Sequence, residues 1–277
     1  MTTTLTDAAV AAAARPRRFG AWYIAEHQLR GMKAYGWTIV AGSVGNPLLY
    51  LLGIGLGLAA FLDQPIASGA DGLADYVWFV APALLATAAV TVAMDEFTFV
   101  IMAGFKWRRY FYGFNASPIS SQQIAQGVIF GAAARMVVVA VAYTAFLYLF
   151  GAVPAFSFGW TMMLVAVLAG LAFGVPLMAY AASVYEDKGQ FALVQRFIFM
   201  PMFLFSGTFY PLDSLPLWLQ WIGWVSPLWH ATELGRWISY GAELSPAMIA
   251  VHFGYLIMLT VVGYILARRF FETRLAK

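Results

Sequence analysis

Long apolar runs constrain the fold of this chain more than any other feature of its sequence. Six such runs occur, at residues 37–62, 76–102, 124–150, 160–184, 191–206 and 247–267. Most reach the roughly 20 residues that an α-helix needs to cross a ~30 Å hydrocarbon layer. They lack the alternation of a membrane β-strand, so we expect helices. Only 10% of the residues are charged, against about a quarter in soluble domains. The predicted fold class is therefore an all-α integral membrane protein with six transmembrane helices.

The distribution of Lys and Arg predicts how these helices are oriented. Basic residues precede the first run, lie between the second and third and between the fourth and fifth, and follow the sixth. Segments 63–75 and 151–159 contain none. Cytoplasmic loops carry the excess of Lys and Arg, so we expect a multi-pass protein of the plasma (inner) membrane with both termini cytoplasmic. Residues 1–17 are predicted to be a disordered cytoplasmic tail, and residues 18–277 a single transmembrane domain.

Residues 18–35 have the pattern of an interfacial amphipathic helix at the N-terminal side of the first span. Glu26, Arg30 and Lys33 recur at positions i, i+4 and i+7. The other stripe is apolar and comprises Trp22, Ala25, Leu29 and Met32. Such a helix lies in the lipid headgroup plane. Two interpretations stay open: a membrane anchor, or a helix that also contacts a cytoplasmic partner.

The connection between the second and third runs interleaves basic and aromatic residues. The cluster comprises Lys106, Trp107, Arg108, Arg109 and Tyr110. One interpretation is a lipid headgroup anchor, since these residue types favour that depth; a second follows from the family resemblance described below. We do not expect nucleic acid as a partner, because nothing else in the sequence builds a groove for it. After the cluster, Ser120 and Gln123 have the spacing of a capping box, which predicts where the third span begins.

Residues 205–228 are apolar enough for a bilayer but are interrupted by Gly207 and three prolines. We expect Asp213 or Ser214 to cap a short helix that extends to about residue 225, with Pro216 in its first turn. Irregular backbone at membrane depth is tolerated only where protein or a watery cavity surrounds it.

A second short helix is expected to follow directly. Ser226 has the position of its cap, Pro227 that of its first residue, and the helix is expected to end near residue 240. The sequence therefore predicts two re-entrant short helices on the outer side, between the fifth and sixth spans. Five tryptophans fit an interfacial aromatic belt: Trp218, Trp221, Trp224, Trp229 and Trp237.

Several kinds of chemistry are missing from the sequence. It contains no GxxxxGK[ST] phosphate-binding loop, no HExxH metal motif and no cysteine. The three histidines are far apart in the sequence, and we expect them to serve packing or hydrogen bonding. An enzyme is not expected, and neither is a metal or cofactor bound by this chain.

One charge, Arg135, falls inside the third run, about a dozen residues or roughly 18 Å from its start. A charge at that depth is costly unless it faces protein or water. Three interpretations remain: a pair within the bundle, a contact with an acidic lipid-like substrate, or a side chain that snorkels outward. Asp95 and Glu96 are predicted to lie at a different depth. Glu233 and Arg236, at i and i+3, are expected to pair on the outer helix.

Two motifs give the chain a resemblance to a known family. They are residues 203–216, FLFSGTFYPLDSLP, and residues 226–236, SPLWHATELGR. A weaker match is Glu96 before an aromatic stretch, followed by the Ser-Pro-Ile-Ser turn at 117–120. With six spans, these motifs resemble the permease subunits of ABC-2 type exporters, above all the nodulation lipo-oligosaccharide and daunorubicin-resistance branches. The resemblance covers most of the chain and is more specific for family than for substrate.

The resemblance implies a permease that works with two copies of a cytoplasmic ABC ATP-binding subunit, where ATP and Mg²⁺ would bind. It also implies a second permease subunit, either another copy of this chain or a relative. Residues 105–121 would form the coupling helix on the ATPase, with Glu26 and Arg30 of the N-terminal helix beside it. An outer gate would be formed by Gly207, Tyr210, Pro211, Asp213 and Pro216. The substrate would be an amphiphile, exported from the cell.

The alternative function is an ion-coupled secondary transporter of a small hydrophobic solute. Such transporters use chains of ionisable residues within the membrane, whereas Arg135 is nearly alone there. Their inverted internal repeats are also not apparent in this sequence. The family resemblance therefore carries the preferred interpretation.

Overall fold

The computed structural model describes residues 2–34, 36–53, 67–69, 72–74, 76–154 and 158–276. The elements, in chain order, are α1 (Thr2–Ala34), α2 (Gly36–Tyr50), β1 (Ala67–Gly69), β2 (Gly72–Ala74), α3 (Tyr76–Met102), the π-helix η3 (Ala103–Trp107), α4 (Tyr110–Asn115), α5 (Ser121–Leu149), the 3₁₀-helix η4 (Phe158–Thr161), α6 (Met162–Ser183), α7 (Gln190–Val194), the π-helix η5 (Gln195–Phe199), α8 (Met200–Phe205), the 3₁₀-helix η6 (Leu212–Ser214), α9 (Leu217–Val225), α10 (Pro227–Tyr240) and α11 (Pro246–Leu275). The two short strands pair antiparallel as a hairpin. The fold is that of an all-α membrane protein.

The long helices agree closely with the predicted runs. Within the described part of the chain, four helical stretches are long and apolar enough to span a membrane: Tyr76–Trp107, Ser121–Leu149, Phe158–Ser183 and Pro246–Leu275. The predicted fifth run corresponds to a shorter apolar stretch, Gln190–Phe205. The predicted first run begins in α2, and its residues 54–62 lie outside the described residues. The number of six crossings stays a prediction.

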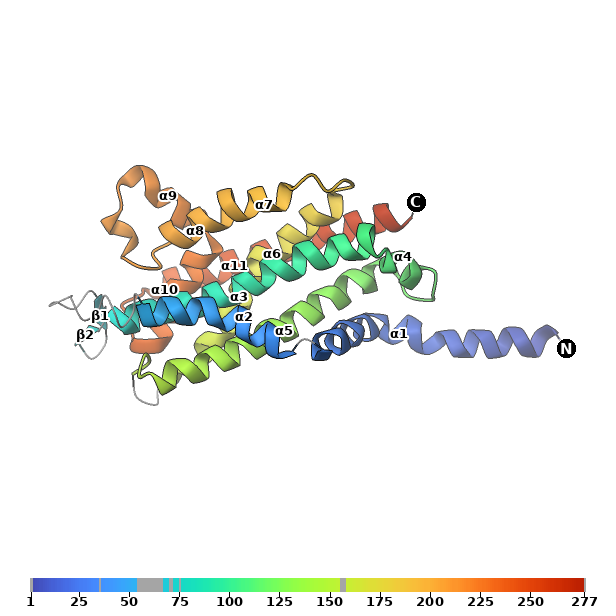
Figure 1. Cartoon of the computed structure of the whole chain (residues 1–277), viewed down its shortest axis with the longest axis horizontal. Coiled ribbons are helices and arrows are strands. Elements are labelled where there is room, and N and C mark those ends of the chain that lie inside the picture. The colour runs from blue at the N-terminus through green and yellow to red at the C-terminus, as the bar shows by residue number, and fades with distance from the viewer. Residues whose placement is uncertain are drawn as a thin grey trace.

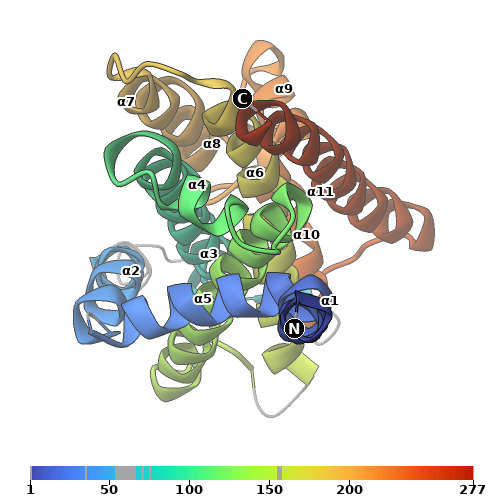
Figure 2. The ribbon, with the colours of Figure 1, turned by 90° about the vertical axis from the view of Figure 1, so that its right-hand side faces the viewer.

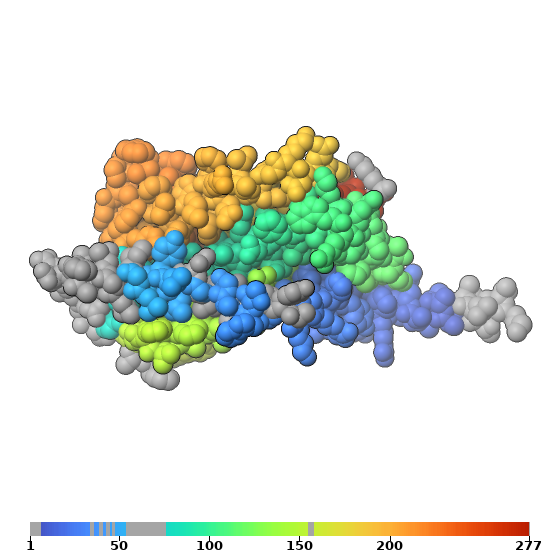
Figure 3. Space-filling view, in the orientation of Figure 1, coloured from blue at the N-terminus to red at the C-terminus, as the bar shows by residue number. Residues whose placement is uncertain are grey.

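The helices form an elongated bundle with two distinct ends (Figure 1). Both chain termini and α4 lie at one end, and α9, α10 and the strand pair lie at the other. We call these the α4 end and the α10 end. In the space-filling view, α7 and α8 (gold) and α9 (orange) form one edge of the molecule (Figure 3).

Helix α3 occupies the centre of the bundle, between α2 on one side and α6 and α11 on the other (Figure 2). It has its most extensive contact with α6, where small residues let the two backbones approach. A Cβ atom at Gly174 of α6 would lie 2.2 Å from the ring of Phe97, and one at Gly170 would lie 3.0 Å from the carbonyl oxygen of Ala89. The core of the membrane domain is therefore a close contact between α3 and α6.

Helix α1 has two parts, separated by a kink at Phe19 (φ −116°, ψ 20°). The part before the kink projects from the body, and the part after it runs across the bundle over α5 (Figures 1 and 2). This second part is the predicted amphipathic helix. The first part is helical, and its alanine run has high helix propensity; the disorder expected for residues 1–17 stays a prediction.

The face with which α1 contacts the bundle matches the predicted apolar stripe in part, because Ala25 is buried and Leu29 and Met32 are half-buried, but Trp22 is not. Ile24 and Ala25 are buried, whereas Trp22 is 60% exposed. The contact is made possible by Gly127 and Gly131 of α5, where Cβ atoms would clash with Ile24 and with the amide of Gln28. Small residues on the partner helix, which the pattern of α1 does not reveal, determine which face is buried.

Candidate functional site

The predicted coupling residues lie at the α4 end, where the chain turns between α3 and α5. Helix α3 continues without a break into η3, and Arg109 (φ 56°) takes a left-handed conformation that starts α4 in a new direction. The side chains of Lys106, Trp107, Arg108 and Arg109 are exposed. We call the exposed set Lys106–Arg109 the basic surface.

Helix α4 is fixed to the bundle by aromatic rings. Phe111 is fully buried, and its ring centroid lies 4.9 Å from that of Phe105 and 5.5 Å from that of Phe271 of α11. The amide Nδ2 of Asn115 donates a hydrogen bond of 3.1 Å to the carbonyl oxygen of Leu275. Helix α4 is therefore packed against and hydrogen-bonded to the last turns of α11.

Arg274 strengthens the same junction. Its side chain is buried, and Nη1 donates to the carbonyl oxygens of Ala182 (2.9 Å) and Val184 (2.7 Å) at the end of α6. The guanidinium also lies 4.2 Å from the ring centroid of Phe105. One cation thus caps the C-terminal end of α6 and stacks on η3, which joins three elements at the α4 end.

Tyr110 connects the basic surface to α1. Its hydroxyl donates to the carbonyl oxygen of Val100 (3.0 Å), and burial raises the pKa of Tyr110 to about 12. Its ring lies 6.0 Å from that of His27 of α1, and His27 also contacts Phe114 edge-on at 5.2 Å. The amphipathic helix and α4 therefore lie side by side.

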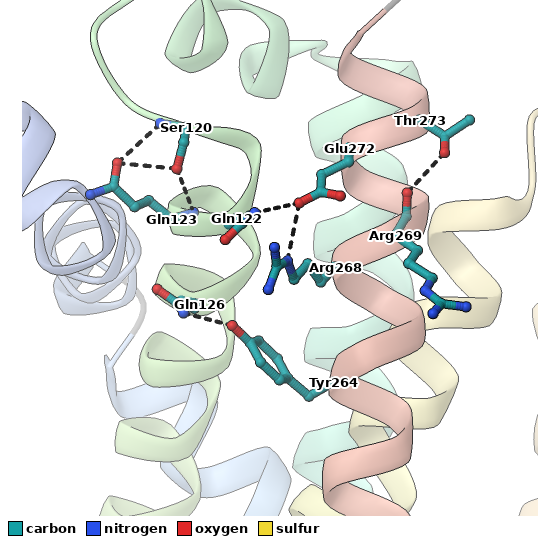
Figure 4. Close-up of polar contacts among 9 residues, drawn as sticks. All are labelled: Ser120, Gln122, Gln123, Gln126, Tyr264, Arg268, Arg269, Glu272 and Thr273. Carbon is teal, nitrogen blue, oxygen red and sulfur yellow. Dashed lines mark hydrogen bonds and ion pairs between the residues drawn. The ribbon is translucent and has the colours of Figure 1, made fainter.

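The polar residues predicted around these elements form local pairs. Glu26 and Arg30 form an ion pair of 2.7 Å on the exposed face of α1. Ser120 caps α5, and the predicted capping box with Gln123 is confirmed (Figure 4).

Helices α5 and α11 are linked by polar side chains near the α4 end (Figure 4). Gln122 donates to Glu272 (2.5 Å), which also accepts from Arg268 (3.1 Å). One turn deeper, Gln126 donates to the hydroxyl of Tyr264 (2.6 Å). Together with the aromatic junction, these bonds make the end of α11 part of the same unit as α4 and α5.

Arg135 pairs with Glu96 of α3, which selects the first of its three interpretations. The two side chains are 15% and 4% exposed, so the pair is buried inside the bundle. The predicted mismatch in depth was wrong because α3 continues through η3 to Trp107. At 1.5 Å per residue, Glu96 lies about 16 Å from that end of α3, and Arg135 lies about 21 Å from the start of α5. The two residues therefore differ in depth by only about 5 Å, and their long side chains bridge this difference.

The predicted outer-gate residues lie at the α10 end, around a buried arginine. Arg236 is 3% exposed and donates to the carbonyl oxygens of Gly207 (2.5 Å) and Phe79 (3.2 Å). It pairs with Glu233 at 2.8 Å, as the sequence predicts, and its guanidinium lies 3.5 Å from the ring centroid of Phe79. Gly207 itself has a left-handed conformation (φ 72°) that favours glycine. Arg236 thus connects α10, the start of α3 and the turn after α8.

The remaining residues of the predicted outer gate shape the chain between α8 and α9. Tyr210 donates to the carbonyl oxygen of Leu204 (2.8 Å) and closes the turn that follows α8. Pro211 and Asp213 line a cavity at this end. Pro216 itself precedes the first residue of α9, and no side chain caps that helix, so the predicted cap by Asp213 or Ser214 was wrong. Leu212–Ser214 instead form the separate turn η6. In contrast, Ser226 caps α10 as predicted.

Two histidines meet at the α10 end, a contact that the sequence pattern does not predict. The Nδ1 atoms of His230 (α10) and His252 (α11) lie 2.7 Å apart, and Nε2 of His230 lies 3.0 Å from the carbonyl oxygen of Trp224. That oxygen only accepts, so Nε2 of His230 carries the proton and Nδ1 of a neutral His230 accepts from His252. Tyr255 stacks on His230 with centroids 4.1 Å apart. The sequence does contain one indication of this contact. His252 lies less than two turns after the start of α11, and this places it at the end of the bundle where α10 lies.

No group of three potential metal ligands occurs among the residues that the structure describes. The described residues form two polar junctions at opposite ends of a bundle of apolar helices, one around Arg274 and one around Arg236. Helix α11 contacts both ends. These are features of an integral membrane protein.

Comparison with known proteins identifies the family. The ABC-2 type transporter family matches residues 21–240, and the chain belongs to this family. The predicted resemblance is confirmed. The chain is therefore an ABC transporter permease, and permeases of this family work with an ABC ATP-binding subunit.

Individual relatives share about a quarter of their residues with this chain. Nodulation protein J of Rhizobium leguminosarum bv. viciae is 27% identical over 250 residues, which cover 86% of this chain and 88% of the relative. The inner membrane transport permease YadH of Escherichia coli is 27% identical over 196 residues, 69% of this chain and 73% of the relative. The probable multidrug ABC transporter permease YbhR of Escherichia coli is 28% identical over 171 residues, 59% of this chain and 44% of the relative.

Proposed function

We propose that this permease belongs to an ATP-driven exporter that moves an amphiphile outward across the plasma membrane. The substrate class is a glycolipid, a lipid-linked saccharide or a hydrophobic drug. One relative is a probable multidrug permease, and this supports a hydrophobic drug as one member of that class. Both termini and the basic surface would face the cytoplasm, in agreement with the excess of Lys and Arg at the α4 end.

An apolar cavity of about 500 Å³ beside α6 supports an amphiphilic substrate. It is lined by residues of α6, α7, η5, α10 and α11, among them Phe173, Leu177, Val194, Ile198 and Leu259. The hydrocarbon part of an amphiphile matches this lining, since it needs no hydrogen bonds.

The partners proposed are two copies of the ATP-binding subunit and a second permease, either another copy of this chain or a relative. The basic surface and the pair Glu26–Arg30 would contact the ATP-binding subunit. ATP and Mg²⁺ would bind in that subunit, and this chain would bind no cofactor. Membrane lipids would cover the exposed apolar sides of α5 and α11 that no second permease covers.

The observation that carries the proposal is the continuous path from α4 to α10 along α11. This helix has 30 residues, about 45 Å at 1.5 Å per residue. One end contacts α4 through Phe271 and Asn115, and the other contacts α10 through His252. When the ATP-binding subunits close and press on α4, α11 would move as a rigid body and shift α10. The outer gate could then open without breaking a helix, because the chain at Gly207 and Pro211 forms turns.

The first test removes the basic surface with Lys106→Ala, Arg108→Ala and Arg109→Ala combined. Charge complementarity governs such contacts between subunits, so we expect loss of the co-purifying ATP-binding subunit and of vanadate-sensitive ATPase activity. A matched control replaces three other exposed cations by Ala: Lys188, Arg196 and Arg269.

The control variant should keep both the partner and its activity. If the basic-surface variant also binds the ATP-binding subunit normally, the coupling assignment is wrong. If substrate uptake persists without any ATP-binding subunit and collapses with an ionophore, the ion-coupled alternative replaces export driven by ATP.

A further inference from the structure

A cavity of about 470 Å³ opens at the α10 end, between η6, α9 and α10. This volume is in the range of small-molecule sites. Its lining combines acidic and aromatic side chains, the most important being Asp213, Glu233, Glu243, Trp224, Trp229 and Tyr240.

The charges in this cavity do not cancel. Arg236 also lines it, but it pairs with Glu233 and donates to two backbone carbonyl oxygens, so it is already engaged. Asp213 and Glu243 are exposed and form no hydrogen bond or ion pair with any residue that the structure describes. Three carboxylates against one guanidinium leave two uncompensated negative charges. An anion would be repelled here, whereas a cation would be attracted.

The aromatic residues supply the second component of a cation site. The ring of Trp224 is about half exposed, and Trp229 lines the same cavity. Tyr240 is 8% exposed, and its hydroxyl has no hydrogen-bond partner within the described ranges of the chain. Burial raises the pKa of Tyr240 to about 12, so the hydroxyl stays neutral at physiological pH. A buried oxygen without a partner can accept a hydrogen bond from a bound molecule.

We propose that this acidic, aromatic cavity binds the ammonium group of a transported amphiphile at the α10 end of the permease. Aromatic faces combined with carboxylates are the arrangement that recognises organic ammonium groups. The inference rests on the proposed function in two points: the substrate is an amphiphile, and the cavity lies on the exit side. It narrows the substrate class to molecules with a cationic group.

The test measures binding to the purified permease in a neutral detergent, without any ATP-binding subunit. Isothermal titration calorimetry compares choline with 3,3-dimethyl-1-butanol, which has the same shape but no charge. We expect saturable binding of choline at one site per chain and at least about tenfold weaker binding of the neutral molecule, the effect of two carboxylates near a cation in a water-like dielectric.

The variant Asp213→Asn/Glu243→Gln removes both free charges, and its exposed side chains leave the fold intact. It should weaken choline binding by about tenfold. The control variant Glu186→Gln/Asp187→Asn removes two exposed acids at the α4 end and should leave binding unchanged.

Three results would overturn the inference: no saturable binding of choline, equal affinity for the neutral molecule, or unchanged affinity in the Asp213/Glu243 variant. The assay contains no ATP, so a failure here leaves the proposed export intact. Conversely, the titration uses the permease alone, so its outcome would be the same if the basic surface turned out not to bind the ATP-binding subunit.

Discussion

The ion pair between Arg135 and Glu96 can be tested by removing its two charges separately and together. In Glu96→Leu, the guanidinium stays charged, because arginine cannot lose its proton in a protein, and its side chain is only 15% exposed. Removing one partner of a buried pair costs about 3–5 kcal/mol. At about 2–4 °C per kcal/mol for chains of similar size, we expect Tm to fall by about 6–20 °C.

The reciprocal variant Arg135→Met should be less damaging, because a carboxyl group left alone can bind a proton and become neutral. The double variant Glu96→Leu/Arg135→Met leaves no buried charge, so most of the lost stability should return. Tm is measured from intrinsic fluorescence in detergent, and a double-mutant cycle gives the coupling energy.

The reasoning is refuted if both single variants change the free energy of unfolding by less than about 0.5 kcal/mol, the error of additivity, and if their effects simply add. Arg135 would then have another partner, or face water. A large effect of Arg135→Met with none for Glu96→Leu would have the same meaning.

Three further predictions concern other parts of the bundle. Arg236→Lys keeps the charge but loses the planar fork that reaches two carbonyl oxygens, and it should lower stability by about 2–3 kcal/mol, measured by thermal unfolding. Gly174→Ala places a Cβ 2.2 Å from the ring of Phe97 and should cost about 1–3 kcal/mol; Gly113→Ala, where a Cβ meets nothing within 4 Å, should cost much less. Burial, reinforced by a neighbouring histidine, lowers the pKa of His230 to about 4, below the ordinary 6.5, so the stability it contributes above pH 6.5 is lost as pH falls towards 4. Tm measured from pH 7.5 to 4.5 should therefore decline less steeply in His230→Gln than in the unmodified protein.

Features set by local chemistry could be predicted from the sequence. The run at residues 76–102 coincides with α3, because continuous apolar character over that length is a property of the segment itself. The caps at Ser120 and Ser226 were also predictable, since each depends on residues no more than three positions away.

Features that depend on neighbouring helices could not be predicted. The partner of Arg135 depends on how far α3 extends as a π-helix, and no pattern in residues 103–107 announces that change. The meeting of His230 and His252 depends on how α10 docks against α11. The buried face of α1 depends on two glycines about a hundred residues away. The roles of the basic surface and the outer gate stay predictions until they are tested.

The last turn of α11 has a practical consequence for anyone who expresses this protein. Asn115 and the carbonyl oxygen of Leu275, with Arg274 beneath them, join the C-terminal residues to α4. An affinity tag fused at the C-terminus, or a deletion of the last four residues, would disturb the element proposed to receive the force of the ATPase. A tag at the N-terminus, on the part of α1 that projects away from the body (Figure 1), would leave that junction untouched.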